Sequence, residues 1–351
     1  MAYDSISGVK IIGMCCCVPD DCRRIADIDN IPEAELNQFI KTTGIKQAFR
    51  SAALNTTTSD LCFSAAENLF KVLSIERDSI DVIIFVSQSP DYIQPATACV
   101  LQYRLGLSND CAAFDISLGC SGYIYGLHMA ALYLQRENIR KVLLLTGESI
   151  ATHKGVIVDK EPALWGDAGS ATILKKDSDA GPTRFLLKTD GSGFRFLGIK
   201  SCSFRHGFDE KVEFIMSGAD VFAFTLREVP KAFKEFYAYF NVEQDDYDIV
   251  ILHQANRMII ESITKKLKIP REKAPISIDL YGNTSSASIP LGICDYFNRQ
   301  NTNVNNANNE IKILASGFGV GLSWGIAGFN IDGRVCLPVI TTDKCWDDGI
   351  I

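Results

Sequence analysis

The chain has 351 residues, 47% of them hydrophobic and 22% charged, so it can bury the core of one large domain or two closely joined ones. Its formal net charge of −7 excludes a general nucleic-acid binder, because neutralising phosphates requires a basic surface. No secretory signal is evident and no apolar stretch reaches the roughly 18 residues of a membrane span, so we expect a cytoplasmic protein without membrane insertion.

Apolar runs of strand length alternate with helical patterns from one end of the chain to the other. In the first half these runs are VIIFVS from Val82, CAAFDIS from Cys111, KVLLLTG from Lys141 and ATILKK from Ala171. In the second half they are DIVILHQAN from Asp248, PISIDLYGN from Pro275, IKILASG from Ile311 and LSWGIAGFN from Leu322. This alternation predicts an α/β architecture with buried sheets.

The chain contains twelve cysteines, which should be mostly reduced in the cytoplasm. Three of them form the run Cys15–Cys17, and Cys22 lies nearby. A zinc site would need paired C-x-x-C or histidine spacing, which this run lacks. We therefore expect no metal site.

The two halves of the chain resemble each other. Short strand and turn segments match at a nearly constant offset; the paired positions are Asp81 with Asp248, Gly119 with Gly282, and Gly147 with Gly317. These matches predict a duplicated αβ unit, with one half at residues 1–180 and the other at 181–351. Because duplicated halves pack face to face, equivalent turns should meet, which would bring Cys120, His253 and Asn283 together.

Cys120 follows a predicted strand and precedes a predicted helix. The apolar positions at helical spacing are Ile124, Leu127, Ala131 and Leu134. A thiol in the first turn of a helix lies near unpaired N–H groups and the positive end of the macrodipole, which lower its pKa and favour a thiolate. The alternative is a packed structural cysteine.

His253 and Asn283 are the other two candidates. His253 ends the apolar run DIVIL, where an imidazole could reach a pocket, although a core histidine bonded to backbone fits the same pattern. Asn283 lies in a turn of small residues, where asparagine is commonly a cap. Papain-like proteases share the order Cys, His, Asn, but the surroundings GCSGY and the duplication argue against that fold.

Five segments carry a more specific signal: GCSGYIYGL, WGDAGSATIL, LHQANRMII, YGNTSSASIP and GFGVGLSWG. In this order they resemble the β-ketoacyl-acyl-carrier-protein synthase III family, the initiating condensing enzymes of the thiolase superfamily. The resemblance runs from Val9 to about Asn330. It implies a thiolase-like five-layered αβαβα fold with two pseudo-symmetric duplicated halves, and a homodimer.

The resemblance also implies an acyltransferase that needs no cofactor and uses acyl-CoA or acyl-carrier-protein thioesters. Cys120 would accept the acyl group, while His253 and Asn283 would serve a decarboxylative Claisen condensation with malonyl-carrier protein. The backbone N–H groups of Cys120 and Val320 would form the oxyanion hole. Residues carried over to the pantetheine tunnel and acyl pocket are Asn256, Gly218, Trp165 and Gln94, and those carried over to carrier-protein docking are Gln254, Arg257, Lys265 and Lys266.

Several positions depart from the family pattern. Gln38 and Thr42 replace a tryptophan and an arginine that bind coenzyme A, and Asp159 falls near a second such arginine. These losses predict a carrier-bound or unusual acyl thioester as starter instead of acetyl-CoA. The alternative is transfer of an acyl group to an oxygen or nitrogen acceptor, in secondary metabolite or surface-sugar biosynthesis, which needs no malonyl decarboxylation. The residues after Asn330 follow no pattern that predicts their structure.

Overall fold

Two mixed β-sheets form the frame of the molecule in a computed structural model, which describes residues 3–28, 31–51, 55–149, 164–200, 205, 207, 214–300 and 310–349. The six-stranded sheet has the order β15 (Ile340–Thr342), β2 (Val9–Pro19), β8 (Ala168–Lys176), β7 (Lys141–Glu148), β5 (Val82–Val86), β6 (Ala112–Ile116). The five-stranded sheet has the order β1 (Tyr3–Ile6), β9 (Thr183–Thr189), β14 (Ser323–Asp332), β13 (Glu310–Gly319), β12 (Ile249–Leu252). Two small hairpins pair β3 (Cys22–Arg24) with β4 (Gln47–Phe49), and β10 (Leu197–Ile199) with β11 (Phe214–Met216).

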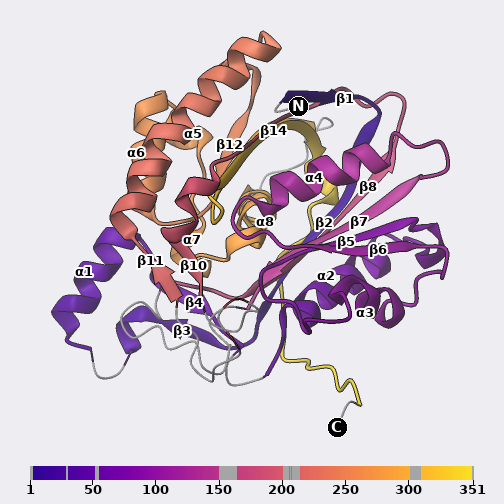
Figure 1. The fold of residues 1–351 in the computed structure, drawn as a ribbon, viewed down its shortest axis with the longest axis horizontal. Helices are drawn as coiled ribbons and strands as arrows, with labels where there is room; N and C mark the ends of the chain where they lie inside the picture. Colours follow the sequence, from indigo (N-terminus) through magenta and orange to yellow (C-terminus); the bar gives the residue numbers. More distant parts are fainter. Residues whose placement is uncertain are drawn as a thin grey trace.

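Helices fill the space between the sheets and cover their outer faces (Figure 1). The middle layer is α4 (Gly122–Tyr133) and α8 (Ser288–Gln300), each in contact with both sheets. The outer layers are α2 (Thr58–Val72) with α3 (Thr97–Arg104) on the six-stranded sheet, and α5 (Gly218–Phe240) with α6 (Arg257–Leu267) on the five-stranded sheet. The molecule therefore has the predicted thiolase-like αβαβα fold.

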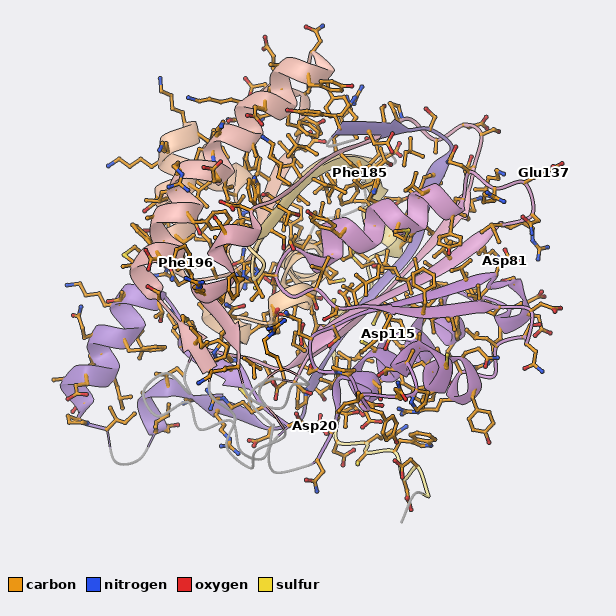
Figure 2. The ribbon with its side chains drawn as sticks, in the orientation of Figure 1. Asp20, Asp81, Asp115, Glu137, Phe185 and Phe196 are labelled. Atoms are coloured by element: carbon orange, nitrogen blue, oxygen red, sulfur yellow. The ribbon has the colours of Figure 1, made fainter. Side chains whose placement is uncertain are left out.

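The composition of α4 explains its place in the middle layer. Its buried residues cover a broad face of the helix that reaches both sheets, as a helix packed between two sheets requires. Gly126 lets it approach the six-stranded sheet, since a Cβ there would lie 2.7 Å from Leu144 Cδ1. On its other face His128 packs edge-on against Phe185, which is buried in the interior, whereas Glu137 points outward beyond the helix (Figure 2).

The two sheets repeat one pairing scheme. The strands β5, β7, β8 and β2 pair parallel, antiparallel and antiparallel, and β12, β13, β14 and β9 do the same. Equivalent aspartates precede the first strand of each set: the N–H of Asp81 donates to the Lys141 carbonyl at 3.0 Å, and that of Asp248 to the Lys312 carbonyl at 2.9 Å. The edge strands β1 and β15 each belong to the sheet of the other half, and the division at residue 180 stays a prediction.

Seven of the eight apolar runs contain the predicted strands, and PISIDLYGN does not. This run contains the short helix α7 (Ile278–Tyr281), so the strand predicted there is wrong. The backbone N–H groups of Ser277 and Ile278 donate to the side-chain Oε1 of Gln254, at 3.0 and 3.3 Å. Because these groups are bonded to a side chain, they do not extend the sheet beyond β12.

The residues after Asn330, whose structure was not predicted, include strand β15, and the end of this segment packs on the outer α2–α3 layer. Trp346 lies against one side of the Arg104 guanidinium and Phe63 against another, with ring centroids 4.5 and 4.7 Å from its central carbon. Arg104 Nη2 donates to Asp60 Oδ1 at 2.7 Å, and both side chains are nearly inaccessible to solvent. The C-terminal segment thus covers a buried ion pair.

Within the described residues no helix is long and apolar enough to cross a membrane, and no group of three or more His, Cys, Asp or Glu side chains could hold a metal ion. The run Cys15–Cys17 lies in β2 with its side chains in the core.

The Arg104–Asp60 pair predicts a large stability effect. Arg104→Met should lower the free energy of unfolding by about 3 kcal/mol, because it leaves the Asp60 carboxylate buried without its cation. Arg23→Met, which breaks an exposed pair with Asp21, should change it by less than about 0.5 kcal/mol. Urea unfolding of both variants measures the difference, and equal effects would contradict this account of the pair.

Candidate active site

A cavity of about 470 Å³ collects most of the residues predicted to act together. Those that line it are Cys120, His253, Asn283, Trp165, Gly218 and Asn256. The helix α1 (Glu33–Thr43) contributes Gln38 and Thr42 to the same lining. The three candidate catalytic side chains come from three separate segments, as the duplication predicts.

Cys120 lies in the turn between β6 and α4, one residue before the helix N-cap Ser121. It therefore precedes the first helical turn in which the sequence placed it. Burial, together with the nearby charge of Glu148, raises the pKa of the Cys120 thiol to about 11. The prediction of a lowered pKa is wrong, because loss of hydration outweighs the neighbouring hydrogen-bond donors.

The turn after β13 packs directly against the Cys120 sulfur. The backbone N–H groups of Cys120 and Val320 both hydrogen-bond this sulfur. A Cβ on Gly319 would lie 2.8 Å from the Cys120 Cβ and 3.0 Å from its sulfur, so only glycine fits at this position. Two backbone donors thus converge at the point where a thioester carbonyl would react, and their role as an oxyanion hole stays a prediction.

His253 immediately follows β12, as predicted, and its ring is buried. The ring Nδ1 lies 2.7 Å from Ser288 Oγ, and the ring packs edge-on against Phe318. Burial lowers the pKa of His253 to about 3. The imidazole is therefore neutral at physiological pH.

The backbone and the side chain of Asn283 are both held in place. Its N–H donates to the Leu164 carbonyl at 2.9 Å, and its own carbonyl accepts from the Gly166 N–H at 3.0 Å. Its side-chain Oδ1 accepts from the Ser285 N–H at 3.0 Å. Since the oxygen is occupied, the NH₂ group of the amide remains for a ligand in the cavity.

Two of the remaining tunnel residues begin helices. Asn256 is the N-cap of α6, where its Oδ1 accepts from the Ile259 N–H at 2.8 Å, and Gly218 is the first residue of α5. Trp165 packs edge-on against Phe214. These three line the cavity as predicted, and their contacts with substrate stay predictions.

Two predicted binding residues are placed differently. Gln254 is 2% exposed, and its amide bonds the Leu252 carbonyl and two backbone N–H groups before α7, so it cannot meet a protein partner at the surface. The docking assignment of Gln254 is therefore wrong. Gln94 is exposed and is not among the lining residues of the cavity in the single chain, and its place in the acyl pocket stays a prediction. Asp159, which falls near the second coenzyme A-binding arginine of the family, lies outside the described residues.

The predicted docking cations lie on α6. Lys265 and Lys266 are exposed in its last turn, and Lys266 Nζ donates to the Leu226 carbonyl at 2.9 Å. Arg257 begins the helix and packs against Gly44, where a Cβ would lie 2.7 Å from the Arg257 Cβ. Gly44 also has φ +79°, so both space and backbone conformation require glycine at this end of α1.

A buried carboxyl group behind the nucleophile was not predicted from the sequence. Glu148, at the end of β7, accepts hydrogen bonds from the hydroxyls of Ser87 and Ser89 and from the Gln88 N–H. Burial raises its pKa to about 8. No sequence signal distinguished it, because it ends an apolar strand as many surface glutamates do.

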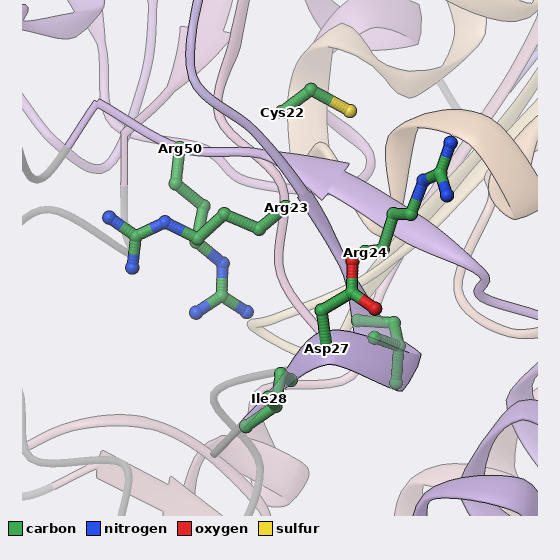
Figure 3. Close-up of a pocket in the computed structure, with 7 residues that line it drawn as sticks. Cys22, Arg23, Arg24, Asp27, Ile28 and Arg50 are labelled. Atoms are coloured by element: carbon green, nitrogen blue, oxygen red, sulfur yellow. The ribbon is translucent and has the colours of Figure 1, made fainter.

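A second cavity, of about 460 Å³, contains none of the predicted catalytic residues (Figure 3). It lies beside β3, with the guanidinium groups of Arg23 and Arg50 on one side and that of Arg24 on the other. Arg23 is paired with Asp21. The chemistry of thiol, imidazole and amide therefore belongs to the first cavity.

Comparison with known proteins places this geometry in a family. Two family models match, "3-Oxoacyl-[acyl-carrier-protein (ACP)] synthase III" at residues 114–191 and its C-terminal counterpart at 238–331. A β-ketoacyl-[acyl-carrier-protein] synthase III of Clostridium perfringens is 33% identical over 298 residues, covering 83% of this chain and 90% of the relative. A putative 3-oxoacyl-[acyl-carrier-protein] synthase 3 of Campylobacter jejuni is 32% identical over 345 residues, covering 92% and 93%.

A solved structure of the same family has the same fold. The crystal structure of a 3-oxoacyl-(acyl-carrier protein) synthase from Burkholderia xenovorans superimposes with a TM-score of 0.87 at 33% identity, covering 97% of this chain and 99% of that one.

The raised pKa of Glu148 predicts that the stability of the folded protein depends on pH. Between about pH 5 and pH 8 the unfolded chain loses this proton while the folded protein keeps it, so stability falls as pH rises through that window and levels off above it. Glu148→Gln removes this titration. Relative to the variant, the wild type should lose about 4 kcal/mol across the window in urea unfolding.

The exposed Glu137→Gln is the matched control and should parallel the wild type at every pH. A Glu148→Gln curve that also ran parallel to the wild type would show that this carboxyl ionises as freely in the folded protein as in the unfolded chain.

Proposed function

The chain belongs to the 3-oxoacyl-[acyl-carrier-protein] synthase III family of condensing enzymes, and from that premise we infer its chemistry. We propose that Cys120 accepts an acyl group from a thioester, and that this group is then condensed with the enolate formed by decarboxylation of a malonyl thioester on a carrier protein. The observation that carries the proposal is the convergence of a thiol, a neutral imidazole and an amide NH₂ in one cavity.

The first half-reaction is acyl transfer to sulfur. Cys120 gives up its proton as its sulfur attacks the thioester carbonyl, and the departing thiol of the donor takes a proton. The oxyanion that forms accepts hydrogen bonds from the N–H groups of Cys120 and Val320. Because these donors already face the sulfur, they need no rearrangement when the charge develops.

The second half-reaction requires donors that carry no charge. Decarboxylation leaves an enolate, whose oxygen accepts from the Asn283 NH₂ and from the His253 ring. When the Ser288 hydroxyl donates to Nδ1, the ring proton resides on Nε2, where it can be donated to the enolate. A neutral ring stabilises the enolate without protonating its carbanion, which then attacks the acyl-Cys120 carbonyl and releases the Cys120 thiolate.

The partners follow from the same premise. The exposed lysines at the end of α6, with Arg257, supply a local cationic surface on an acidic protein, which suits an acidic carrier protein. The reaction uses no cofactor. We propose that the enzyme works as a homodimer in the cytoplasm.

The mouth of the cavity supports a carrier-bound donor. Gln38 and Thr42 bond each other, with Gln38 Nε2 3.2 Å from Thr42 Oγ1, and neither carries a charge for the phosphates of coenzyme A. A carrier protein brings its own binding surface, so it does not depend on such contacts.

Incubation with a panel of acyl-CoA and acyl-carrier-protein thioesters tests the nucleophile. Mass spectrometry of the intact protein should show one added acyl group in the wild type and in Cys99→Ala, an exposed control cysteine, and none in Cys120→Ala. Added mass on Cys120→Ala would disprove the assignment.

Release of CO₂ from malonyl-carrier protein tests the condensation. His253→Ala should keep the acylation of Cys120 but lower CO₂ release by about 10²-fold, because one enolate donor is lost. Acyl-Cys120 without CO₂ release in the wild type would instead support transfer to an oxygen or nitrogen acceptor.

The donor preference is tested by Thr42→Arg. The added charge should raise kcat/KM for an acyl-CoA about fivefold through a phosphate contact, and leave that for the matching acyl-pantetheine unchanged. In the wild type the two donors should react equally well. A strong wild-type preference for acyl-CoA would overturn the proposal of a carrier-bound donor.

A further inference from the structure

One residue outside the three candidates contacts all of them. The Ser285 hydroxyl lies 3.6 Å from the Cys120 sulfur, and its backbone N–H donates to Asn283 Oδ1 at 3.0 Å. Its backbone also hydrogen-bonds the His253 ring. No other residue in the described parts of the chain hydrogen-bonds all three of these side chains.

The backbone conformation of Ser285 is what allows these contacts. Its φ of +49° lies in the left-handed region, which residues other than glycine seldom occupy. Such a conformation costs free energy and persists only where the surroundings fix it. Here the surroundings are the buried turn η7 (Ser285–Ala287) and the start of α8, and the side chain is 2% exposed.

We propose that Ser285 is the positioning residue of this site, with its hydroxyl holding the Cys120 sulfur and its strained backbone orienting Asn283 and His253. The inference rests on the proposed function for its importance in turnover, but its contacts exist without substrate. An O–H donor at the sulfur favours the thiolate over the thiol, since it bonds the charged form more strongly. The N–H bond to Oδ1 meanwhile presents the NH₂ group of Asn283 to the cavity.

Because the site is buried, the Ser285 hydroxyl has a strong effect on the pKa of Cys120. Loss of hydration and the Glu148 charge both raise the pKa of Cys120, and the Ser285 hydrogen bond is the largest of the contributions that lower it. Removing the hydroxyl would therefore leave the thiol harder to ionise, although the sulfur would stay in the same place.

The matched control is its neighbour. Ser286 has the same side chain and is equally buried, but its hydroxyl bonds the Gly147 and Val86 carbonyls of the six-stranded sheet, at 3.1 and 3.5 Å. Ser286→Ala thus removes a buried hydroxyl of the same turn without touching the catalytic trio. Ser285→Gly provides a second comparison with Ser285→Ala, because glycine relieves the backbone strain while both remove the hydroxyl.

The test is the rate at which iodoacetamide alkylates Cys120 between pH 7 and pH 10, read on the Cys120 peptide by mass spectrometry with the exposed Cys99 as internal reference. Ser285→Ala and Ser285→Gly should each move the pH profile upward by about one unit, so that alkylation at a given pH falls about tenfold. Ser286→Ala should stay within about twofold of the wild type. Thermal unfolding of each variant shows that it is folded.

Unchanged profiles in both Ser285 variants, or an equal shift in Ser286→Ala, would overturn the inference. The readout needs no substrate, so a wild type that fails to condense would disprove the proposed function and leave this inference standing. If the profile shifts in Ser285→Ala but not in Ser285→Gly, backbone strain and not the hydroxyl controls the thiol, and the role assigned to the side chain is wrong.

Discussion

The site depends on the burial of α4 and α8 between two sheets. Each helix begins at a turn that is bonded to the sheet of the other half: the Ser121 hydroxyl before α4 lies 2.6 Å from the Ser323 hydroxyl of β14, and the Ser286 hydroxyl before α8 donates to the Gly147 carbonyl of β7. This reciprocal bonding fixes the two turns against each other. The sulfur of Cys120 and the amide of Asn283 meet because neither turn can move without breaking contacts to the opposite sheet.

Burial also decides the charge state of the site. It raises the pKa of the thiol and lowers that of the imidazole, so the resting cavity holds Cys120 and His253 as neutral groups. A neutral site admits an apolar acyl chain and does not attract water to a fixed charge. Charge appears only during the reaction, where backbone and side-chain donors are already aimed at it. The same environment therefore serves substrate entry and both oxyanions.

The sequence predicted the features that repeat and not those that depend on tertiary packing. Strand periodicity and the duplication identified the sheets, and their turns identified Cys120 and Asn283. The direction of the Cys120 pKa shift was wrong, because a local helix argument does not include desolvation by the other half of the molecule. The family resemblance assigned Gln254 to carrier-protein docking, but its buried amide is bonded by backbone groups before α7 instead. Ser285 carried no signal, since a positive φ at a serine cannot be deduced from a serine-rich turn.

The exchange of edge strands has a consequence for how the molecule can be built. β15 comes from the end of the described chain but completes the sheet of the first half, while β1 comes from its beginning and completes the sheet of the second. A ribosome that has made only the first half has therefore produced a sheet whose β2 edge is open, and an open edge invites pairing with other chains. Neither half is a self-sufficient folding unit, so the duplication visible in the pairing scheme no longer corresponds to two separable pieces.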